Sequence, residues 1–394
     1  AVNCWRRAPL GEVARFERAT INAQDIKDGA LYVGLENIGA GGAFVNVRNV
    51  AAGDLASNKF AFGEHHVLYG KLRPYLAKVA RPTFSGVCST DILPILPGPG
   101  LTRDFLAHFL RSPRVVDLAT SRSTGVNLPR VSPDALAGFE MPVPPLCEQR
   151  RIAAILDQAD ALKATRRAAT RRLDQLVLAT FLDMFGDPGV NPNAWTSEPI
   201  GAYVAKFQGG KSIEADKDEA EPTLYRVLKV SAVTQMRFNA EESKPVPNDY
   251  APPSEHIVRP GDLLFSRANT SELVGAVAYI ETVPANTLLP DKLWRFVWSQ
   301  PQQADPLFVW ALFQTKAIRR EISKRATGTS GSMKNISQAK LRGIRTILPP
   351  LGIQQQFAMR ARELERARIL QHRSLTEFDA LFASLQHRAF RGEL

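Results

Sequence analysis

The sequence predicts an α+β fold: two similar mixed α/β modules separated by an antiparallel coiled coil of two long helices, with pseudo-two-fold symmetry. Three observations lead to this prediction. Two stretches have the pattern of long helices, the chain repeats itself over most of its length, and the remaining segments alternate short apolar runs with glycine and proline. We therefore divide the chain into a first module at 1–143, a first long helix at 144–186, a second module at 187–348 and a second long helix at 349–394.

The first long helix is predicted between two proline-containing boundaries. Pro144 and Pro145 disfavour helix before it, Glu148 places negative charge in its first turn, and Gly186 and Pro188 end it. The predicted apolar seam, which skips position 166, consists of Ile152, Ile155, Ala159, Leu162, Ala169, Leu173, Leu176 and Phe181. Such a narrow seam favours one long partner helix. The alternative, two independent surface helices on separate domains, would bury it poorly.

The chain supplies the partner itself. The stretch after Pro349 repeats the first helix at an offset of 205 positions, so that Gln149 aligns with Gln354 and Asp174 with Asp379. The predicted seam of this second helix consists of Phe357, Ala361, Leu364, Leu375, Phe378, Phe382 and Leu385. We expect the two seams to pack against each other.

The repeat continues through the modules. The offset grows smoothly from 190 to 205, as small loop insertions in two copies of one architecture would produce. Corresponding pairs are Trp5 and Trp195, Tyr69 and Phe265, Asp91 and Asp291, Phe105 and Phe308, and Ser132 and Ser337. We expect strands at 31–33, 67–68, 92–96, 263–265, 274–280 and 293–298, helices at 105–110 and 307–320, and a proline-rich loop at 245–260.

Composition points to a soluble protein with a polyanionic partner. The chain has 50 Lys and Arg against 39 Asp and Glu, a net charge of +11. Its three cysteines, Cys4, Cys88 and Cys147, lie far apart and lack metal-site spacing, which is typical of a reducing compartment. No run is long enough to cross a membrane, and the opening residues do not resemble a secretory signal. We therefore expect a cytoplasmic protein.

No catalytic motif is complete. The GGKS at 209–212 lacks the first glycine of a phosphate loop, since Ala205 stands there. None of the Pro-Pro pairs completes the Asn/Asp-Pro-Pro-aromatic motif of an amino-methyltransferase, and His65 with His66 has no second pair of metal ligands nearby. We expect no catalytic residue, no metal and no cofactor in this chain, and therefore no enzyme.

Two similar but unequal modules held apart by paired helices suit a ligand that carries two separated and different recognition sites. Duplex DNA carrying a split recognition sequence is such a ligand. In the first module the candidate contacts are Lys71, Arg73 and Tyr75, and then Arg122, Ser123, Asn127 and Arg130. The fork of Arg73 suits a guanine edge, whereas Lys71 suits a phosphate.

The second module offers candidates at matching positions. They are Lys211, Arg267, Asn269, Thr270, Arg325, Lys334, Asn335 and Gln338, several of them in the clusters at 266–271 and 330–335. Asn and Gln suit adenine edges, and Ser, Thr and Lys suit phosphates. The alternative is that an individual arginine is simply solvated, or that Asn269 caps a turn.

Six motifs together carry a resemblance over essentially the whole chain. They are GKLRPYLAKV at 70–79, STDILPI at 89–95, PPLCEQRRIAAILD at 144–157, SRANTSELVG at 266–275, SMKNISQAKL at 332–341 and LQHRAFRGEL at 385–394. In this order, and duplicated, they resemble the specificity (S) subunit of Type I restriction–modification systems.

The resemblance implies that the modules are target-recognition domains, each reading one half of a split site in double-stranded DNA. It also implies assembly with two modification subunits, which use S-adenosylmethionine to methylate adenine, and with restriction subunits, which use ATP and Mg. Two alternatives from other classes remain: a fused modification or restriction enzyme, and a protein-binding scaffold whose modules do not read DNA sequence.

Overall fold

The computed structural model describes residues 5–213, 224–330 and 333–394, so Cys4 and two residues of the predicted cluster at 330–335, Gly331 and Ser332, lie outside the described residues. The chain forms two compact units. Unit 1 comprises residues up to 169 together with 371–394, and unit 2 comprises 170–370. Each unit is a mixed α/β module combined with parts of both long helices, which confirms the predicted fold class.

Unit 1 is built around a four-stranded sheet in the order β2-β10-β7-β8, at Ala14–Phe16, Ile92–Pro97, Val67–Gly70 and Val79–Ala80. A five-stranded sheet has the order β3-β6-β9-β4-β5, at Thr20–Ile21, Lys59–Phe62, Gly86–Cys88, Ala30–Val33 and Arg48–Val50. Strand β1 (Arg6–Pro9) pairs with β11 (Glu140–Val143). The helices are α1 (Leu10–Val13), α2 (Arg103–Arg111), α3 (Pro113–Ser121) and α4 (Pro133–Ala137). The buried phenylalanines of α2 fix it against the four-stranded sheet.

Unit 2 repeats this plan. Its four-stranded sheet has the order β13-β20-β16-β18, at Val204–Gly209, Leu293–Trp298, Leu263–Ser266 and Val277–Tyr279. Two three-stranded sheets follow, β15-β14-β19 at Ser243–Pro245, Arg226–Leu228 and Thr287–Leu288, and β17-β22-β21 at Ala268–Asn269, Met333–Asn335 and Thr327–Ser330. Strand β12 (Ser197–Pro199) pairs with β23 (Arg345–Ile347). The helices are α6 (Ile200–Tyr203), α7 (Pro306–Gln314), α8 (Lys316–Arg325) and α9 (Gln338–Arg342).

The register of the two central sheets reproduces the sequence repeat. Tyr69 pairs with Leu93 in unit 1, and Phe265 pairs with Trp294 in unit 2. Two predicted segments were longer than the elements observed. The segment 274–280 forms a strand only from Val277, and the helix predicted at 307–320 breaks at Thr315. The hydroxyl of Thr315 accepts a hydrogen bond from the N–H of Ile318 and so begins a new helix there.

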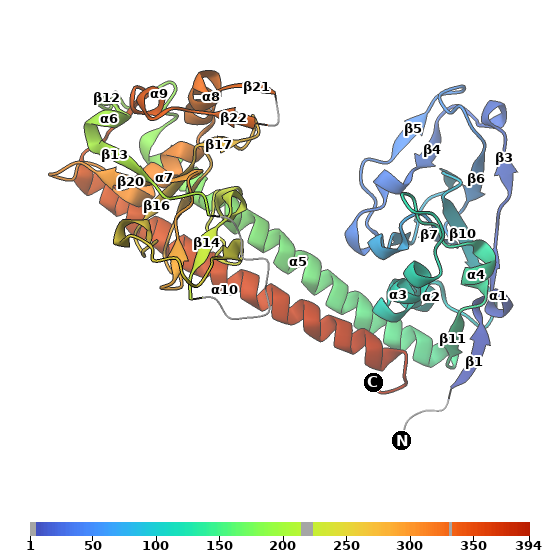
Figure 1. The fold of residues 1–394 in the computed structure, drawn as a ribbon. Coiled ribbons are helices and arrows are strands. Elements are labelled where there is room, and N and C mark those ends of the chain that lie inside the picture. The colour runs from blue at the N-terminus through green and yellow to red at the C-terminus, as the bar shows by residue number, and fades with distance from the viewer. Residues whose placement is uncertain (1–4, 214–223, 331–332) are drawn as a thin grey trace. The chain divides into compact units, whose positions relative to one another are not determined.

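The two long helices, α5 (Leu146–Phe185) and α10 (Leu351–Ala389), pack together in antiparallel fashion (Figure 1). In unit 1, residues near the start of α5, such as Ile152, share a core with Phe382 near the end of α10. In unit 2 the reverse holds, since Phe181 near the end of α5 packs against Phe357 near the start of α10 at a ring distance of 5.5 Å. Each seam therefore finds its partner in the same chain, as predicted.

The predicted composition of the first seam was partly wrong. Leu162, Ala169 and Leu176 are exposed. In their place, the ammonium of Lys163 lies over the ring of Phe382 at 5.2 Å, and the guanidinium of Arg166 lies over the ring of Phe378 at 4.9 Å. Long basic side chains can cover apolar surface with their stems while their charged ends stay near water, so counting apolar residues misplaced the seam.

Each long helix is fixed to its module by a buried glutamine at its start. Gln149 accepts a hydrogen bond from the N–H of Thr102 at 2.8 Å and donates to the carbonyl oxygens of Gly100 and Pro144. Gln354 makes the matching three bonds in unit 2. Because these bonds satisfy buried backbone groups beside the first turn of α5 and of α10, they fix where each helix leaves its module.

Candidate nucleic-acid interface

In unit 1 the two predicted DNA-contact clusters lie side by side. Leu72 and Thr124 each form a β-bridge with Arg130, and the N–H of Arg73 donates to the carbonyl of Pro129 at 2.7 Å. We call these segments, residues 71–75 and 122–130, the first ribbon. The fold thus brings together candidates that are about 50 positions apart in sequence.

In unit 2 the corresponding segments form a small sheet, β17-β22-β21. Ala268 and Thr327 both pair with Asn335, at offsets of 196, 203 and 205 from the three bridge residues of the first ribbon. We call residues 267–270 and 327–335, as far as they are described, the second ribbon. The same pairing therefore recurs in both units, although the side chains at matching positions differ.

The first ribbon carries both free and fixed basic groups. Arg73 has a left-handed φ of 51° and an exposed side chain with no hydrogen-bond or ion-pair partner among the described residues. Tyr75, at 51% exposure, follows it. Arg130, in contrast, is bound to Asp91, with Nε to Oδ1 at 3.0 Å and Nη2 to Oδ2 at 3.3 Å. These hydrogen bonds raise the pKa of the Arg130 guanidinium.

The other candidates of unit 1 lie along the same ribbon. Lys71 donates its backbone N–H to the carbonyl of Asp91 at 2.9 Å, and Asn127 is exposed. The guanidinium of Arg122 lies over the ring of Phe139 at 5.5 Å, and the Ser123 hydroxyl donates to the backbone of α3. The last two side chains therefore contact the module itself.

The second ribbon holds one arginine in a confined position. Arg267 donates from Nε to the carbonyl of Asp291 at 3.0 Å and from Nη1 to Oδ1 of Asn335 at 3.2 Å. Its guanidinium lies over the ring of Trp294 at 5.7 Å. A ring face on one side and acceptors at the edges restrict the rotamers of Arg267.

Four further candidates of unit 2 make contacts within the protein. Lys334 donates to the carbonyl of Gly328 within the ribbon, and Gln338 donates to that of Phe207. Arg325 pairs with Glu321 on α8, and Lys211 lies over the ring of Tyr250. Those four groups therefore already have partners in the protein.

Asn269 and Thr270 sit at the end of β17. Asn269 Oδ1 accepts from the N–H of Thr270 at 2.9 Å, which is the turn-capping role considered above. Its Nδ2 is buried without a partner in the described part of the chain. A buried donor with no acceptor is costly in free energy, so a hydrogen bond from this Nδ2 to a new acceptor would be favourable.

Sequence reasoning missed three residues that shape these ribbons: Asp91, Asp291 and Trp294. Donors to DNA are the residues that a sequence pattern for DNA binding indicates, and carboxylates, which repel phosphate, do not belong to that pattern. The available evidence was the repeat itself, which aligns Asp91 with Asp291.

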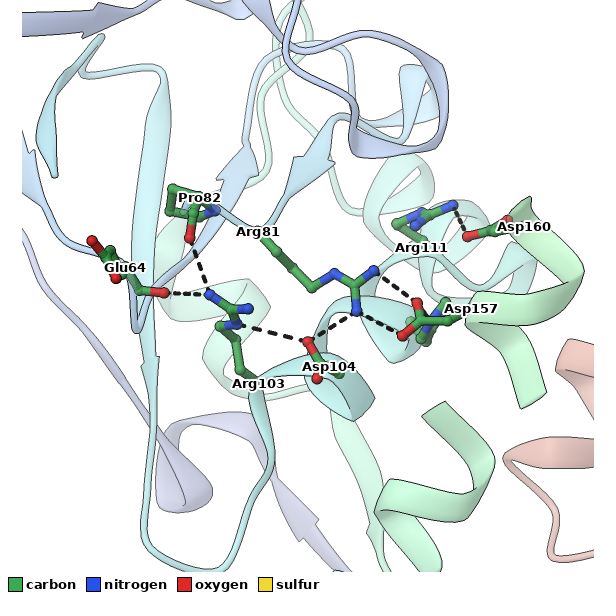
Figure 2. Close-up of polar contacts among 9 residues, drawn as sticks. Glu64, Arg81, Pro82, Arg103, Asp104, Arg111, Asp157 and Asp160 are labelled. Carbon is green, nitrogen blue, oxygen red and sulfur yellow. Dashed lines mark hydrogen bonds and ion pairs between the residues drawn. The ribbon is translucent and has the colours of Figure 1, made fainter. Parts of the chain in front are cut away.

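A cluster of ion pairs fixes the module of unit 1 to α5. Figure 2 shows Arg81 binding both Asp104 and Asp157, and Arg111 binding Asp160 at 2.6 Å. The neighbouring Arg103 donates to the carbonyl oxygens of Glu64 and Pro82 (Figure 2).

Asp157 is the centre of this cluster. It also accepts from Nε2 of the fully buried His108 at 2.8 Å. Burial of Asp157 opposes its ionisation, but the hydrogen bonds from His108 and Arg81 outweigh burial and hold its pKa well below the usual range.

Unit 2 departs from unit 1 at the same place. Arg362 occupies the position that corresponds to Asp157, and a cavity of about 520 Å³ lies beside it, lined also by Tyr279, Trp310 and Ile369. The carboxylate at the centre of the unit 1 cluster is therefore replaced by a guanidinium in unit 2.

The described residues contain no group of three or more His, Cys, Asp or Glu side chains that could hold a metal ion. Within the same ranges, no helix is both long and apolar enough to cross a membrane.

Comparison with known proteins agrees with these features. Residues 5–171 match the Type I restriction modification DNA specificity domain. The chain is 26% identical over 306 residues to the Type I restriction enzyme EcoKI specificity subunit of Escherichia coli K12, a match that covers 74% of this chain and 65% of that protein. The chain thus spans just under two thirds of the length of that relative.

Solved structures show the same fold. One, from work on complex assembly and conformational transition of the type I R-M system, has a TM-score of 0.62 at 20% identity and is covered completely, as is this chain. A second, the S subunit of a Type I restriction–modification system from M. genitalium, has a TM-score of 0.58 at 12% identity, with 99% of this chain and 96% of that one covered. The predicted resemblance to specificity subunits of Type I restriction–modification systems is confirmed.

Proposed function

We propose that this chain is the noncatalytic DNA-recognition subunit of a Type I restriction–modification complex. Each module reads one half of a bipartite site in double-stranded DNA. The paired helices α5 and α10 set the spacer between the halves and dock the modification subunits. The observation that carries this proposal is the duplicated ribbon, which presents Lys71, Arg73 and Arg130 in one unit and Arg267 and Asn335 in the other from the same backbone pairing.

The division of labour within each ribbon follows from side-chain chemistry. A guanidinium or amide can donate to a base edge and so selects sequence, whereas a lysine ammonium on a phosphate adds affinity without selection. The net charge of +11 supports the second, salt-dependent part. Sequence choice and overall affinity therefore reside in different residues.

The helices supply geometry. An α-helix of 40 residues is roughly 60 Å long, and its length cannot change without breaking backbone hydrogen bonds. Two modules attached to such a pair would engage half-sites at one separation only. A spacer of fixed length and free sequence is the expected consequence.

Chemistry belongs to the partners in this proposal. The modification subunits bring S-adenosylmethionine and extrude the target adenine from the stack, while this chain holds the duplex. The restriction subunits bring ATP and Mg. This chain itself needs no cofactor.

The test is methylation of a random-sequence duplex library by the chain together with its modification subunits and S-adenosylmethionine, followed by sequencing of the methylated adenines. We expect one bipartite sequence with two specified halves and one spacer length. Equal methylation and binding of all sequences would favour the scaffold alternative. Methyl transfer by the purified chain alone would favour the fused enzyme.

A further inference from the structure

One aspartate in each unit contacts a guanidinium, but the arginine comes from a different strand in each case. Asp91 and Asp291 align in the sequence repeat, and each lies just before a central strand, Asp91 one residue before β10 and Asp291 two residues before β20. Asp91 binds Arg130, which follows the loop of the first ribbon. Asp291 contacts Arg267, which precedes β17 and corresponds to Lys71. The position that corresponds to Arg130 in unit 2 is Asn335, so the arginine comes from a different segment of the ribbon in each unit, whereas the aspartate precedes the central strand in both.

The contacts of Arg130 leave one edge of its guanidinium free. Asp91 takes a donor from Nε and one from Nη2, and the carbonyl of Leu128 takes one from Nη1 at 3.3 Å. An arginine has five N–H donors, so one donor remains on each terminal nitrogen. The end of the guanidinium, where Nη1 and Nη2 lie side by side, is the fork that matches O6 and N7 of guanine.

Arg267 is also held at its side edge, by other groups. Its Nε faces the carbonyl of Asp291, its Nη2 lies 4.0 Å from Oδ2 of the same residue, and its Nη1 donates to Asn335. The ring of Trp294 supports one face of the guanidinium. The backbone carbonyl of Asp291 thus occupies Nε, its carboxylate lies near Nη2, and each terminal nitrogen keeps at least one donor for a ligand. Its side chain is 29% exposed and that of Arg130 is 41% exposed, so both forks can be reached by a ligand.

We propose that Asp91 and Asp291 are positioning residues for DNA reading, each holding the side edge of one arginine so that its end-on fork meets a guanine. The reading arginine is Arg130 in the first half-site and Arg267 in the second. This inference rests on the proposed function and names the residues that give it sequence selectivity.

The geometry assigns a role that affinity alone would not need. A carboxylate beside the interface repels phosphates, so its presence weakens binding to any DNA. The carboxylate instead fixes the orientation of the arginine, because a guanidinium bound at its side edge cannot turn towards a phosphate. Loss of the aspartate should therefore reduce selectivity at one base pair while overall affinity stays the same or rises.

The experiment compares the wild-type complex with modification subunits against complexes carrying Asp91→Asn or Asp291→Asn. Each is equilibrated with a random duplex library, and bound sequences are counted. Asp28→Asn is the matched control, because Asp28 is an exposed acid of the same unit as Asp91, makes no hydrogen bond or ion pair with the first ribbon as described, and undergoes the same charge change. Arg130→Lys and Arg267→Lys keep the charge but remove the fork.

We expect Asp91→Asn and Arg130→Lys to lower the preference for guanine at one position of the first half-site about tenfold, and to leave the second half-site unchanged. Asp291→Asn and Arg267→Lys should do the reverse. Unchanged preference in both halves for all four variants would overturn the inference, as would a uniform loss of binding with the base preferences intact. If the wild-type complex itself showed no sequence preference, the proposed function would fail instead.

Discussion

The side-chain amide of Gln354 accepts a hydrogen bond from the backbone N–H of Asp305 at 2.9 Å, joining the first turn of α10 to the residue that caps α7. In unit 1, Gln149 and Thr102 make the same contact at 2.8 Å between α5 and α2. One glutamine per repeat thus connects a long helix to the core of its module.

Replacing Gln354 with Ala should therefore destabilise unit 2. The substitution removes the partner of the N–H of Asp305 and of the carbonyl oxygens of Gln303 and Pro349, of which the first and last are buried, and this costs about 2–4 kcal/mol. Urea unfolding measures the loss, and hydrogen exchange at the Asp305 amide localises it. The neighbouring Gln355 is exposed, so Gln355→Ala is the control and should be nearly neutral. Equal effects of the two variants would contradict this role.

An aromatic contact at the other end of each helix gives a second prediction. Phe185 of α5 is fully buried, and its ring centroid lies 5.0 Å from that of Phe308 of α7. In unit 1 the ring centroids of Phe390 and Phe105 are likewise 5.3 Å apart. Truncation of Phe185 to Ala should cost about 3–5 kcal/mol, because it removes a large buried side chain and leaves a cavity. Thermal unfolding reports the loss. The exposed Leu182 on the same helix serves as the control, and a comparable loss on Leu182→Ala would count against the packing argument.

The cluster around Asp157 predicts a pH dependence. Its pKa in the folded protein lies below the ordinary value of 3.8, so ionised Asp157 stabilises unit 1 at pH values above about 4, and this contribution is lost as the pH falls further. Asp157→Asn should thus be less stable than wild type at pH 7, and the difference should shrink as the pH is lowered through 4 towards 3. Unfolding free energies across this range test it, with Asp28→Asn as the control. A difference that stays constant with pH would exclude an electrostatic origin.

Two basic residues of the first ribbon should behave differently on DNA. Arg73 is exposed and unpaired in the described structure. If it reads a base, Arg73→Ala should lower the free-energy preference for the recognised base at one position of one half-site by about 1–3 kcal/mol. Lys71→Ala should instead weaken all sequences alike and reduce the slope of log affinity against log salt by about one. Gel shifts across salt with specific and random duplexes distinguish the two. Identical behaviour of both variants would contradict this assignment.

Much of the fold could be predicted because it depends on periodicity and repetition. A heptad-like pattern that occurs twice predicts its own pairing, and the strands around Tyr69 and Phe265 are short apolar runs between turns. The centre of the helix pair could not be predicted in this way. There Asp379 accepts from Lys163 at 2.7 Å and lies 3.2 Å from Arg167, so charged residues that lie outside both predicted seams make the contacts.

The sequence indicates which segments form the candidate site, but not which of their side chains are held by other residues of the protein. The donors near Lys71 and Arg130 were identified, and the repeat implied that the second module has an equivalent set. Which donors are fixed could not be deduced, because the partner of each depends on strand pairing. Asp91 lies 39 positions before Arg130 in sequence, and the pairing of the segment at Lys71 and Leu72 with both residues brings them together.

The central claim is that the helix pair sets the distance between two DNA-reading modules. Inserting one heptad into α5 after Thr165 and one into α10 after Thr376 lengthens both helices by about 10 Å, or roughly three base pairs of duplex. Sequencing the DNA methylated by the complex with its modification subunits measures both halves and the spacer at once. We predict a longer spacer between unchanged half-sites, whereas an unchanged spacer in a folded, active complex would contradict the account.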